Sequence, residues 1–422
     1  MTYTGRGSRS GKPPVQKIEL QNEIPRWKWI LLIILVALAL TAFAYGINSA
    51  LSKESGWTEI EVNSTSEINC GEEFVLMYNL GASGTSATVE NKAITNLYSE
   101  SSMKAYQLFT NDVEYVGINN ISYINSHPNE EIEVDEVLYQ AFSLIQEYEN
   151  RNVYLAPIYV QYDDMFYCND DSEIVYYDPF SNEEVAEDYR EIAAFARNPE
   201  AIDIQLLGDD KIKLYVSDEY LKYAEENYIT CFVDFFWMKN AFIIDYLADV
   251  LISNGYTSGS ISSYDGFVRN LDESGTEFAF NIYDKVDDTI YYAGVMQYSG
   301  SQSIVYLRNY MMNNQDIQHY YQLRNGEVRT SYLDIQDGIC KSSLNNLILH
   351  SKELGCAEVL LHMIPIYIAD TFQEEALSDL VDKEIYSIYC KDHMIYYNDS
   401  SITFTELYDK DQIKYETSLM AK

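Results

Sequence analysis

The chain has 422 residues, of which 47% are hydrophobic, so it is long enough to bury a large core as one or two domains. Its formal net charge is −38, yet the first 28 residues carry six basic and two acidic side chains, which leaves −42 on the remainder. A surface of that sign repels nucleic acid, which excludes a polynucleotide as a partner.

The N-terminal end combines a basic tail with an uncharged apolar run. The run Ile30–Ile47 contains no charged residue. With the residues up to position 50 it is long enough to span a bilayer core of roughly 30 Å. Because the basic residues precede this run and the acidic bulk follows it, the positive-inside rule places the tail in the cytoplasm and the rest of the chain outside the cell.

A cleavable signal peptide is the rival interpretation, since Ala42–Ala44 has the small-residue pattern of a cleavage site. The basic tail is long for the first part of a signal peptide, so we expect a retained single-pass anchor in the cell membrane. The predicted organisation is a cytoplasmic tail at 1–29, an anchor at 30–50, an extracellular stalk with the first strands at 51–86, and the main domain at 87–422.

Periodicity predicts several helices and strands in the main domain. The segment 133–150 carries apolar residues at helical spacing, and the segment 182–198 has an acidic start and a basic end, as a helix dipole prefers. The β-branched and aromatic content predicts a meander of four strands at 257–264, 277–284, 289–298 and 303–312. We further predict a helix at 342–355 that ends at Gly355, and an apolar strand at 357–370. Helices and strands in separate runs indicate an α+β fold.

The segment VDFFWMKNAFIID, from Val233 to Asp245, places two aspartates around an aromatic turn. The run 230–237 predicts a buried strand, and the apolar residues that follow share one helical face that closes near Asn254. The N-terminus of a helix beside a strand end favours anions. The turn is filled by bulky side chains, so the segment alone supports either a core element or a ligand site.

Six cysteines form no C-x-x-C pair, so their spacing indicates no metal motif. Disulfides are permitted outside the cell, but a core of this size does not require them. The cysteines therefore do not decide between the classes of function considered below.

The order of motifs between 87 and 370 resembles the ApbE family, the FAD:protein FMN transferases. Val233-Asp234 and Asp245 match the two aspartates of the family pattern L-D-x-G-x-I-A-K-G-Y-A-x-D at the same separation. The segment HYYQLRNGEV, with His319, is similar to H-I-I-D-P-x-T-G, and KSSLNNLILHSKELG is similar to the late D-A-L-S-T-A-L-F helix. The resemblance implies a flavin-transferase-like (T-fold-like) α+β domain at 87–422, with FAD as substrate and an exported flavoprotein as acceptor.

The resemblance also assigns site residues. Those that correspond to cofactor-binding positions or lie beside them are Asp234, Asn240, His319, Tyr154 and Asp265. In the family an Asp, a Thr and a backbone oxygen hold Mg²⁺, and the corresponding residues here are Ser342, Asn346 and Trp237. Magnesium prefers hard oxygen ligands with at least one carboxylate, so we expect no tight Mg²⁺ site. No catalytic residue is assigned.

Each polar residue of the central segment has a structural interpretation beside the functional one. Asp234 either binds the N–H groups of the turn or contacts a ligand. Asp245 lies off the apolar face, so we expect it to be solvated or ion-paired and worth less than about 0.5 kcal/mol. His319 is either a strand-end residue or a catalytic base, and Asp265 either belongs to a turn or contacts the flavin.

We therefore expect a membrane-anchored extracellular ApbE-like protein, a pseudoenzyme in which FMN transfer is weak or absent. Two alternatives stay open. One is active Mg²⁺-dependent transfer of FMN from FAD onto a Thr or Ser of an exported acceptor. The other is a non-catalytic ectodomain that binds a flavin or a partner protein.

Overall fold

The computed structural model describes residues 53–63, 70–272, 274–312, 319–410 and 412–420. Residues 54–422 form one compact unit. The predicted tail and anchor at 1–50 lie outside the described residues. Within the described ranges, no helix is both long enough and apolar enough to cross a membrane.

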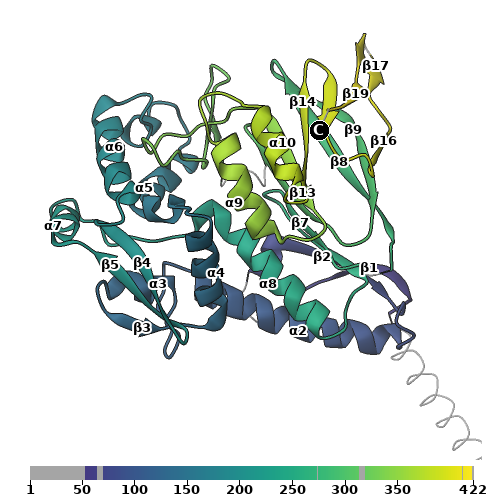
Figure 1. Ribbon diagram of the computed structural model, residues 1–422, viewed down its shortest axis with the longest axis horizontal. Coiled ribbons are helices and arrows are strands. Elements are labelled where there is room, and N and C mark those ends of the chain that lie inside the picture. Colours follow the sequence, from purple (N-terminus) through teal and green to yellow (C-terminus); the bar gives the residue numbers. More distant parts are fainter. Residues whose placement is uncertain (1–52, 64–69, 273, 313–318, 411, 421–422) are drawn as a thin grey trace, which may run out of the picture. The chain divides into compact units, whose positions relative to one another are not determined.

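The unit contains helices and strands in largely separate groups, which confirms the predicted α+β class (Figure 1). The helices are α2 (Ala87–Phe109), α3 (Ile121–Ser126), α4 (Glu136–Glu147), α5 (Ala156–Phe166), α6 (Glu183–Arg197), α7 (Asp218–Glu226), α8 (Lys239–Ser253), α9 (Cys356–Tyr367) and α10 (Glu375–Val381). The helices predicted at 133–150, at 182–198 and after Asn240 are therefore confirmed as α4, α6 and α8.

The largest sheet has nine strands in the order β1-β2-β6-β7-β10-β13-β14-β15-β19. Their bounds are β1 Gly56–Ile60, β2 Phe74–Leu80, β6 Gly259–Ser263, β7 Phe267–Asn270, β10 Ser303–Arg308, β13 Asn346–Ser351, β14 Ile385–Lys391, β15 Met394–Tyr397 and β19 Glu416–Leu419. Neighbouring strands are antiparallel, except that β15 and β19 are parallel. Since β1 pairs with β2, the expected stalk belongs to the folded unit from Gly56 onward.

Among the described residues, four smaller sheets accompany the large one. Their strands are β3 Glu131–Glu133, β4 Ile202–Gly208, β5 Lys211–Val216, β8 Glu277–Val286, β9 Thr289–Ser299, β16 Thr403–Thr405, β11 Tyr320–Gln322, β12 Val328–Thr330, β17 Asp409–Lys410 and β18 Ile413–Lys414. The four predicted strands exist as β6, β8, β9 and β10, but the predicted meander is wrong. After β7 the chain leaves the large sheet for the β8–β9 hairpin, and β10 returns to pair with β7.

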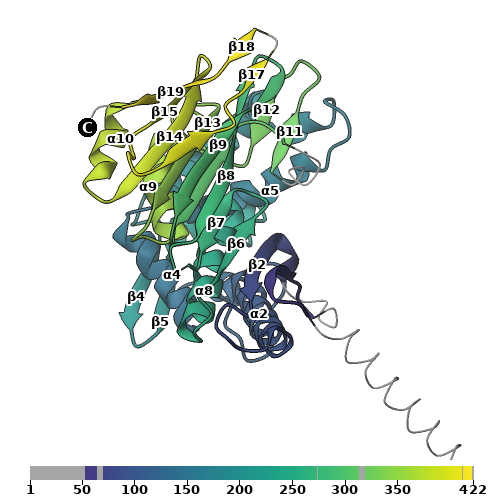
Figure 2. The same ribbon diagram turned by 90° about the vertical axis from the view of Figure 1, so that its right-hand side faces the viewer.

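The central strands of the large sheet are buried on both faces. In β10, Val305 and Leu307 belong to the main core with the helices, whereas Ile304 and Tyr306 belong to a second core shared with β8 and β9. This alternation follows from the two-residue period of a strand. Figure 2 shows the β8–β9 hairpin lying over the strands of the large sheet, on the side away from α8 and α9.

Two predicted elements are wrong. The segment 342–355, predicted as a helix, contains strand β13, and the segment 357–370, predicted as a strand, contains helix α9. Neither segment shows a clear amphipathic period, because β13 is buried on both faces although half of its residues are polar, and α9 is buried over most of its surface. Gly355 therefore precedes a helix instead of closing one.

Candidate functional site

The run 230–237 forms no strand, contrary to prediction, although most of it is buried. The side chain of Asn125 takes the place of a neighbouring strand. Its Oδ1 accepts hydrogen bonds from the N–H groups of Phe232 (2.7 Å) and Val233 (3.0 Å), and its Nδ2 donates to the carbonyl of Val233 (2.9 Å). One buried asparagine thus satisfies backbone groups that a sheet would otherwise pair.

Asp234 lies at the end of this extended run and is 6% exposed. Its Oδ1 accepts from the N–H of Phe236 (3.1 Å) and its Oδ2 accepts from the Nδ2 of Asn111 (2.6 Å). Burial raises the pKa of Asp234 to about 6, although the Phe236 N–H and Lys239 act in the opposite direction. Asp234 therefore accepts a hydrogen bond from a turn N–H, as the structural interpretation predicted, and it also lines the cavity described below.

The turn after Asp234 has a strained backbone. Phe236 has φ +40°, in a region that bulky residues rarely adopt, and it begins a short 3-10 helix, Phe236–Met238, which leads into α8. The resemblance places a family glycine at this position. The ring of Phe236 stacks on Tyr159 with 4.8 Å between centroids and 12° between planes. The turn therefore keeps a glycine-like backbone while an aromatic ring occupies the space above it.

A cavity of about 440 Å³ opens beside this turn. Carboxylates and rings dominate its walls. The lining residues with charged, polar or aromatic side chains are Glu73, Tyr106, Phe109, Thr110, Asn111, Asp112, Asp163, Tyr167, Asp234, Phe236, Trp237, Lys239 and His319. The cavity is therefore predominantly acidic.

A second, much smaller cavity adjoins the first, because Trp237 and His319 line both. Asp265 also lines it, and the Nδ2 of Asn240 donates to the Oδ2 of Asp265 (3.0 Å). Burial raises the pKa of the Asp265 carboxyl above its ordinary value, and the nearby His319 offsets only part of this rise. Of the predicted cofactor-binding residues, Asp234, His319, Asp265 and Asn240 therefore gather around these two cavities.

Tyr154, the fifth predicted cofactor-binding residue, lies elsewhere in the core and is 1% exposed. Its hydroxyl donates to Asp203 Oδ1 (3.3 Å) and accepts from the N–H of Ile204 (2.8 Å). The ring therefore ties the 3-10 helix Asn152–Leu155 to strand β4 and lines neither cavity.

The three positions assigned to Mg²⁺ do not meet. Trp237 lines the acidic cavity, Ser342 lines a separate groove, and Asn346 is fully buried in β13. The side chain of Asn346 is already engaged, since its Nδ2 donates to Asp284 (3.1 Å) and its Oδ1 accepts from the N–H of Cys390 (3.2 Å). In the described part of the chain, no group of three His, Cys, Asp or Glu side chains is placed to hold a metal ion.

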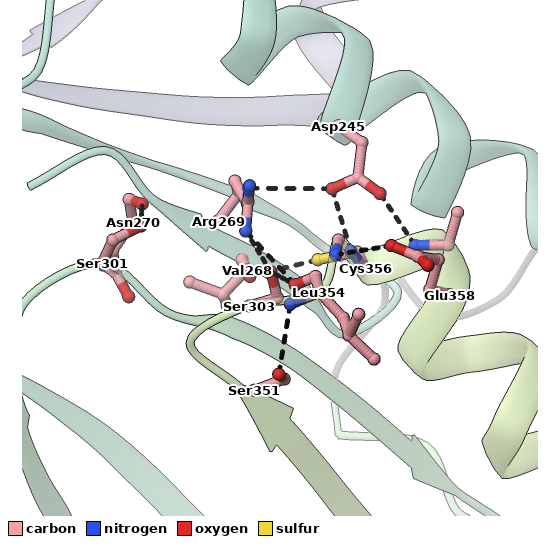
Figure 3. A network of polar contacts seen from close by, with 12 residues as sticks. Asp245, Val268, Arg269, Asn270, Ser301, Ser303, Ser351, Leu354, Cys356 and Glu358 are labelled. Carbon is pink, nitrogen blue, oxygen red and sulfur yellow. Dashed lines mark hydrogen bonds and ion pairs between the residues drawn. The ribbon is translucent and has the colours of Figure 1, made fainter. Parts of the chain in front are cut away.

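The side chain of Asp245 is largely buried, so the expectation of a solvated residue is wrong, and its ion-pair partner Arg269 belongs to β7 instead of α8. Figure 3 shows that its carboxylate points from α8 toward the first residues of α9. Its two oxygens accept from the N–H groups of Cys356 (2.9 Å) and Ala357 (2.8 Å), and Arg269 Nε lies 3.8 Å from Oδ1. A Cβ on Gly355 would lie 2.4 Å from Asp245 Oδ2, which explains the glycine at this position.

Sequence reasoning missed Asn111, Asn125, Asp112 and Asp163. These residues lie far from the central segment in sequence, and only the fold brings them to Asp234. For Asn111 and Asp112, the sequence offered one indication. They follow the end of the long helix α2, and loops at the ends of helices often carry functional residues.

Comparisons with known proteins agree with this architecture. Neither a protein-family sequence model nor a curated protein matches the chain. Among solved structures, the ApbE protein from Thermotoga maritima matches with a TM-score of 0.52 and 13% identity, over 83% of this chain and 97% of that one. The flavin transferase ApbE from Vibrio cholerae matches with a TM-score of 0.49 and 14% identity, over 84% and 97% of the two chains.

The chain is thus an α+β protein with an acidic cavity at the entry to its central helix. Its fold is that of the ApbE proteins, as the resemblance predicted.

Proposed function

We propose that this chain is a membrane-anchored extracellular member of the ApbE family in which Mg²⁺-dependent transfer of FMN from FAD is weak or absent. The observation that carries the proposal is the separation of Trp237, Ser342 and Asn346 into three different surroundings. Phosphoryl-transfer chemistry depends on positioned charge and metal, and these three neutral side chains supply neither.

The charge of the cavity supports the same conclusion. A diphosphate brings negative charge, and the cavity already holds four carboxylates, including Asp234 and Asp163. Without a cation between them, phosphate and carboxylate repel at close range. The residues present therefore do not fit the diphosphate of FAD, and no reaction step is assigned to Mg²⁺ or FAD here.

The aromatic walls favour one alternative, a non-catalytic ectodomain that holds a flavin ring without transferring it. The aromatic side chains of Tyr167, Phe236 and Trp237 line the same cavity. This alternative and the active-enzyme alternative both require FAD to bind, and an exported acceptor protein is a partner only if transfer occurs.

We expect no FMN transfer when the full-length protein, purified in detergent, is incubated with FAD, Mg²⁺ and a Thr-bearing acceptor peptide. Intact-mass spectrometry of the peptide reads out the result, with an active flavin transferase as the positive control. A peptide that gains FMN at a rate comparable to that of the positive control would overturn the proposal and establish the active-enzyme alternative.

Ser342→Asp provides a matched variant for this assay. Although it restores the carboxylate of the family motif, Ser342 lines a groove that does not include Trp237 or Asp234. We therefore expect the variant to bind Mg²⁺ no more tightly than the unmodified protein in calorimetry. Micromolar Mg²⁺ affinity in either protein would contradict this expectation.

The proposed topology has its own test. Protease added to intact cells should remove the domain while an N-terminal tag stays protected, because the basic tail precedes the apolar run Ile30–Ile47. A protected C-terminus, or a mature chain that begins near Tyr45, would show that the orientation or the retained anchor is wrong.

A further inference from the structure

The acidic cavity carries more negative charge than its own cations balance. Lys239 is the one lysine or arginine among its lining residues within the described ranges, and it lies 3.6 Å from Glu73. No lysine or arginine of the described residues forms an ion pair with Asp112, Asp163 or Asp234, which leaves three carboxylates in excess. Such an excess favours a cationic occupant.

Aromatic side chains line the same cavity as these carboxylates. Phe236 and Trp237 come from the turn before α8, Tyr106 and Phe109 from α2, and Tyr167 follows α5. The face of an aromatic ring attracts a cation within about 6 Å of its centroid, and sites for organic ammonium ions use this attraction. A wall of rings also favours a carbon body over a bare metal ion.

The adjoining small cavity adds an independent observation. Its volume of about 10 Å³ is close to the space of a single water. Asp265 Oδ1 and the Oγ of Ser331, which is fully buried, both belong to its lining and have no hydrogen-bond partner among the described residues. Asn240 Oδ1 is buried without a donor as well. Unpartnered buried acceptors are costly, and N–H donors from a ligand would satisfy them.

We propose that the acidic cavity and the adjoining small cavity together bind a small organic cation. This cation is a protonated primary amine with an aromatic or alkyl body. The carbon body lies against Phe236, Trp237 and Tyr167. The ammonium group faces the carboxylates. At the end shared with the small cavity, its N–H groups supply donors to Asp265 Oδ1 and Ser331 Oγ, which have none among the described residues. The proposal goes beyond the loss of FMN transfer and does not depend on it.

Calorimetry on the full-length protein in detergent tests the proposal with three probes of one shape. Benzylammonium carries the positive charge, benzyl alcohol is neutral and benzoate is negative. We expect benzylammonium to bind at least tenfold more tightly than benzyl alcohol, benzoate not to bind, and the affinity for benzylammonium to fall as NaCl is raised. Equal affinity for benzylammonium and benzyl alcohol would overturn the proposal.

A pair of neighbouring variants locates the site. Asp163→Asn should weaken benzylammonium binding about tenfold, because Asp163 lines the cavity. Asp164→Asn should change it less than about twofold, since Asp164 is exposed and outside the lining. Benzyl alcohol should bind both variants as it binds the parent, which shows that the cavity remains folded. An unchanged affinity of Asp163→Asn for benzylammonium would place the cation elsewhere and reject this site.

The binding experiment and the FMN-transfer assay can fail independently, so failure of the cation site can be told apart from failure of the proposed function. A protein that transfers FMN and also binds benzylammonium would overturn the proposed function alone. A protein that transfers no FMN and binds benzylammonium no more tightly than benzyl alcohol would overturn the cation site alone.

Discussion

Replacing Asp245 by alanine should lower the free energy of unfolding by about 2–3 kcal/mol, measured by chemical denaturation at pH 7. The substitution leaves the N–H groups of Cys356 and Ala357 without their acceptor and Arg269 without its carboxylate. Relief of the buried charge offsets part of this loss, which keeps the expected cost below the sum of the separate contacts.

Asp249→Ala is the matched control. Asp249 lies one turn further along the same helix and is exposed, so its loss should change the free energy of unfolding by less than about 0.5 kcal/mol. If both variants melt like the parent, the contacts between α8 and the start of α9 contribute nothing measurable, and our description of Asp245 is wrong.

The contribution of Asp245 should also depend on pH. Burial raises the pKa of Asp245 to about 6 in the folded state, from an ordinary value near 3.8. Between about pH 4 and 6 the folded protein holds this proton and the unfolded chain does not, so the free energy of unfolding falls as the pH rises. The fall attributable to Asp245 should approach about 3 kcal/mol and end above pH 6.

Asp245→Asn isolates this contribution, because other groups titrate in the same window. Burial raises the pKa of Asp234 to about 6, which has the same sign. Burial lowers the pKa of His350 and of His362 to about 4, and these groups make the folded state more stable as the pH rises from about 4 to 6.5. From pH 7 down to pH 4, the parent should therefore gain about 3 kcal/mol of unfolding free energy relative to Asp245→Asn, as followed by denaturation curves of both proteins at pH 4, 5, 6 and 7. Parallel profiles would show that Asp245 keeps its ordinary pKa.

The turn before α8 combines a glycine-like backbone with a bulky side chain. Phe236 keeps the positive φ that a glycine would adopt easily, and its ring gains a stacked contact with Tyr159. Backbone strain of this kind costs of the order of 1–3 kcal/mol and is maintained only when the surrounding packing fixes it.

The sequence alone was sufficient where local signals agree. Helix α6 has acidic residues in its first turn, Arg197 in its last and apolar residues at helical spacing, and helix α8 closes at Asn254 and Gly255 as predicted. The order of motifs also indicated the ApbE fold, because an ordered set of weak matches is more specific than each match.

Other features were decided by tertiary structure. Strand β13 is half polar in sequence yet buried along its whole length, and helix α9 is apolar around most of its surface, so neither shows a clear amphipathic period. Only their places between packed layers determine which is strand and which is helix. In the helical pattern Asp245 looks like a surface residue. In the fold, the start of α9, more than a hundred residues further along the chain, packs against it and donates a hydrogen bond to its carboxylate. The acidic cavity likewise exists only because α2, α5 and the turn before α8 converge. Sequence patterns report a residue's local period, whereas burial, hydrogen bonding and charge balance depend on what the fold places against it.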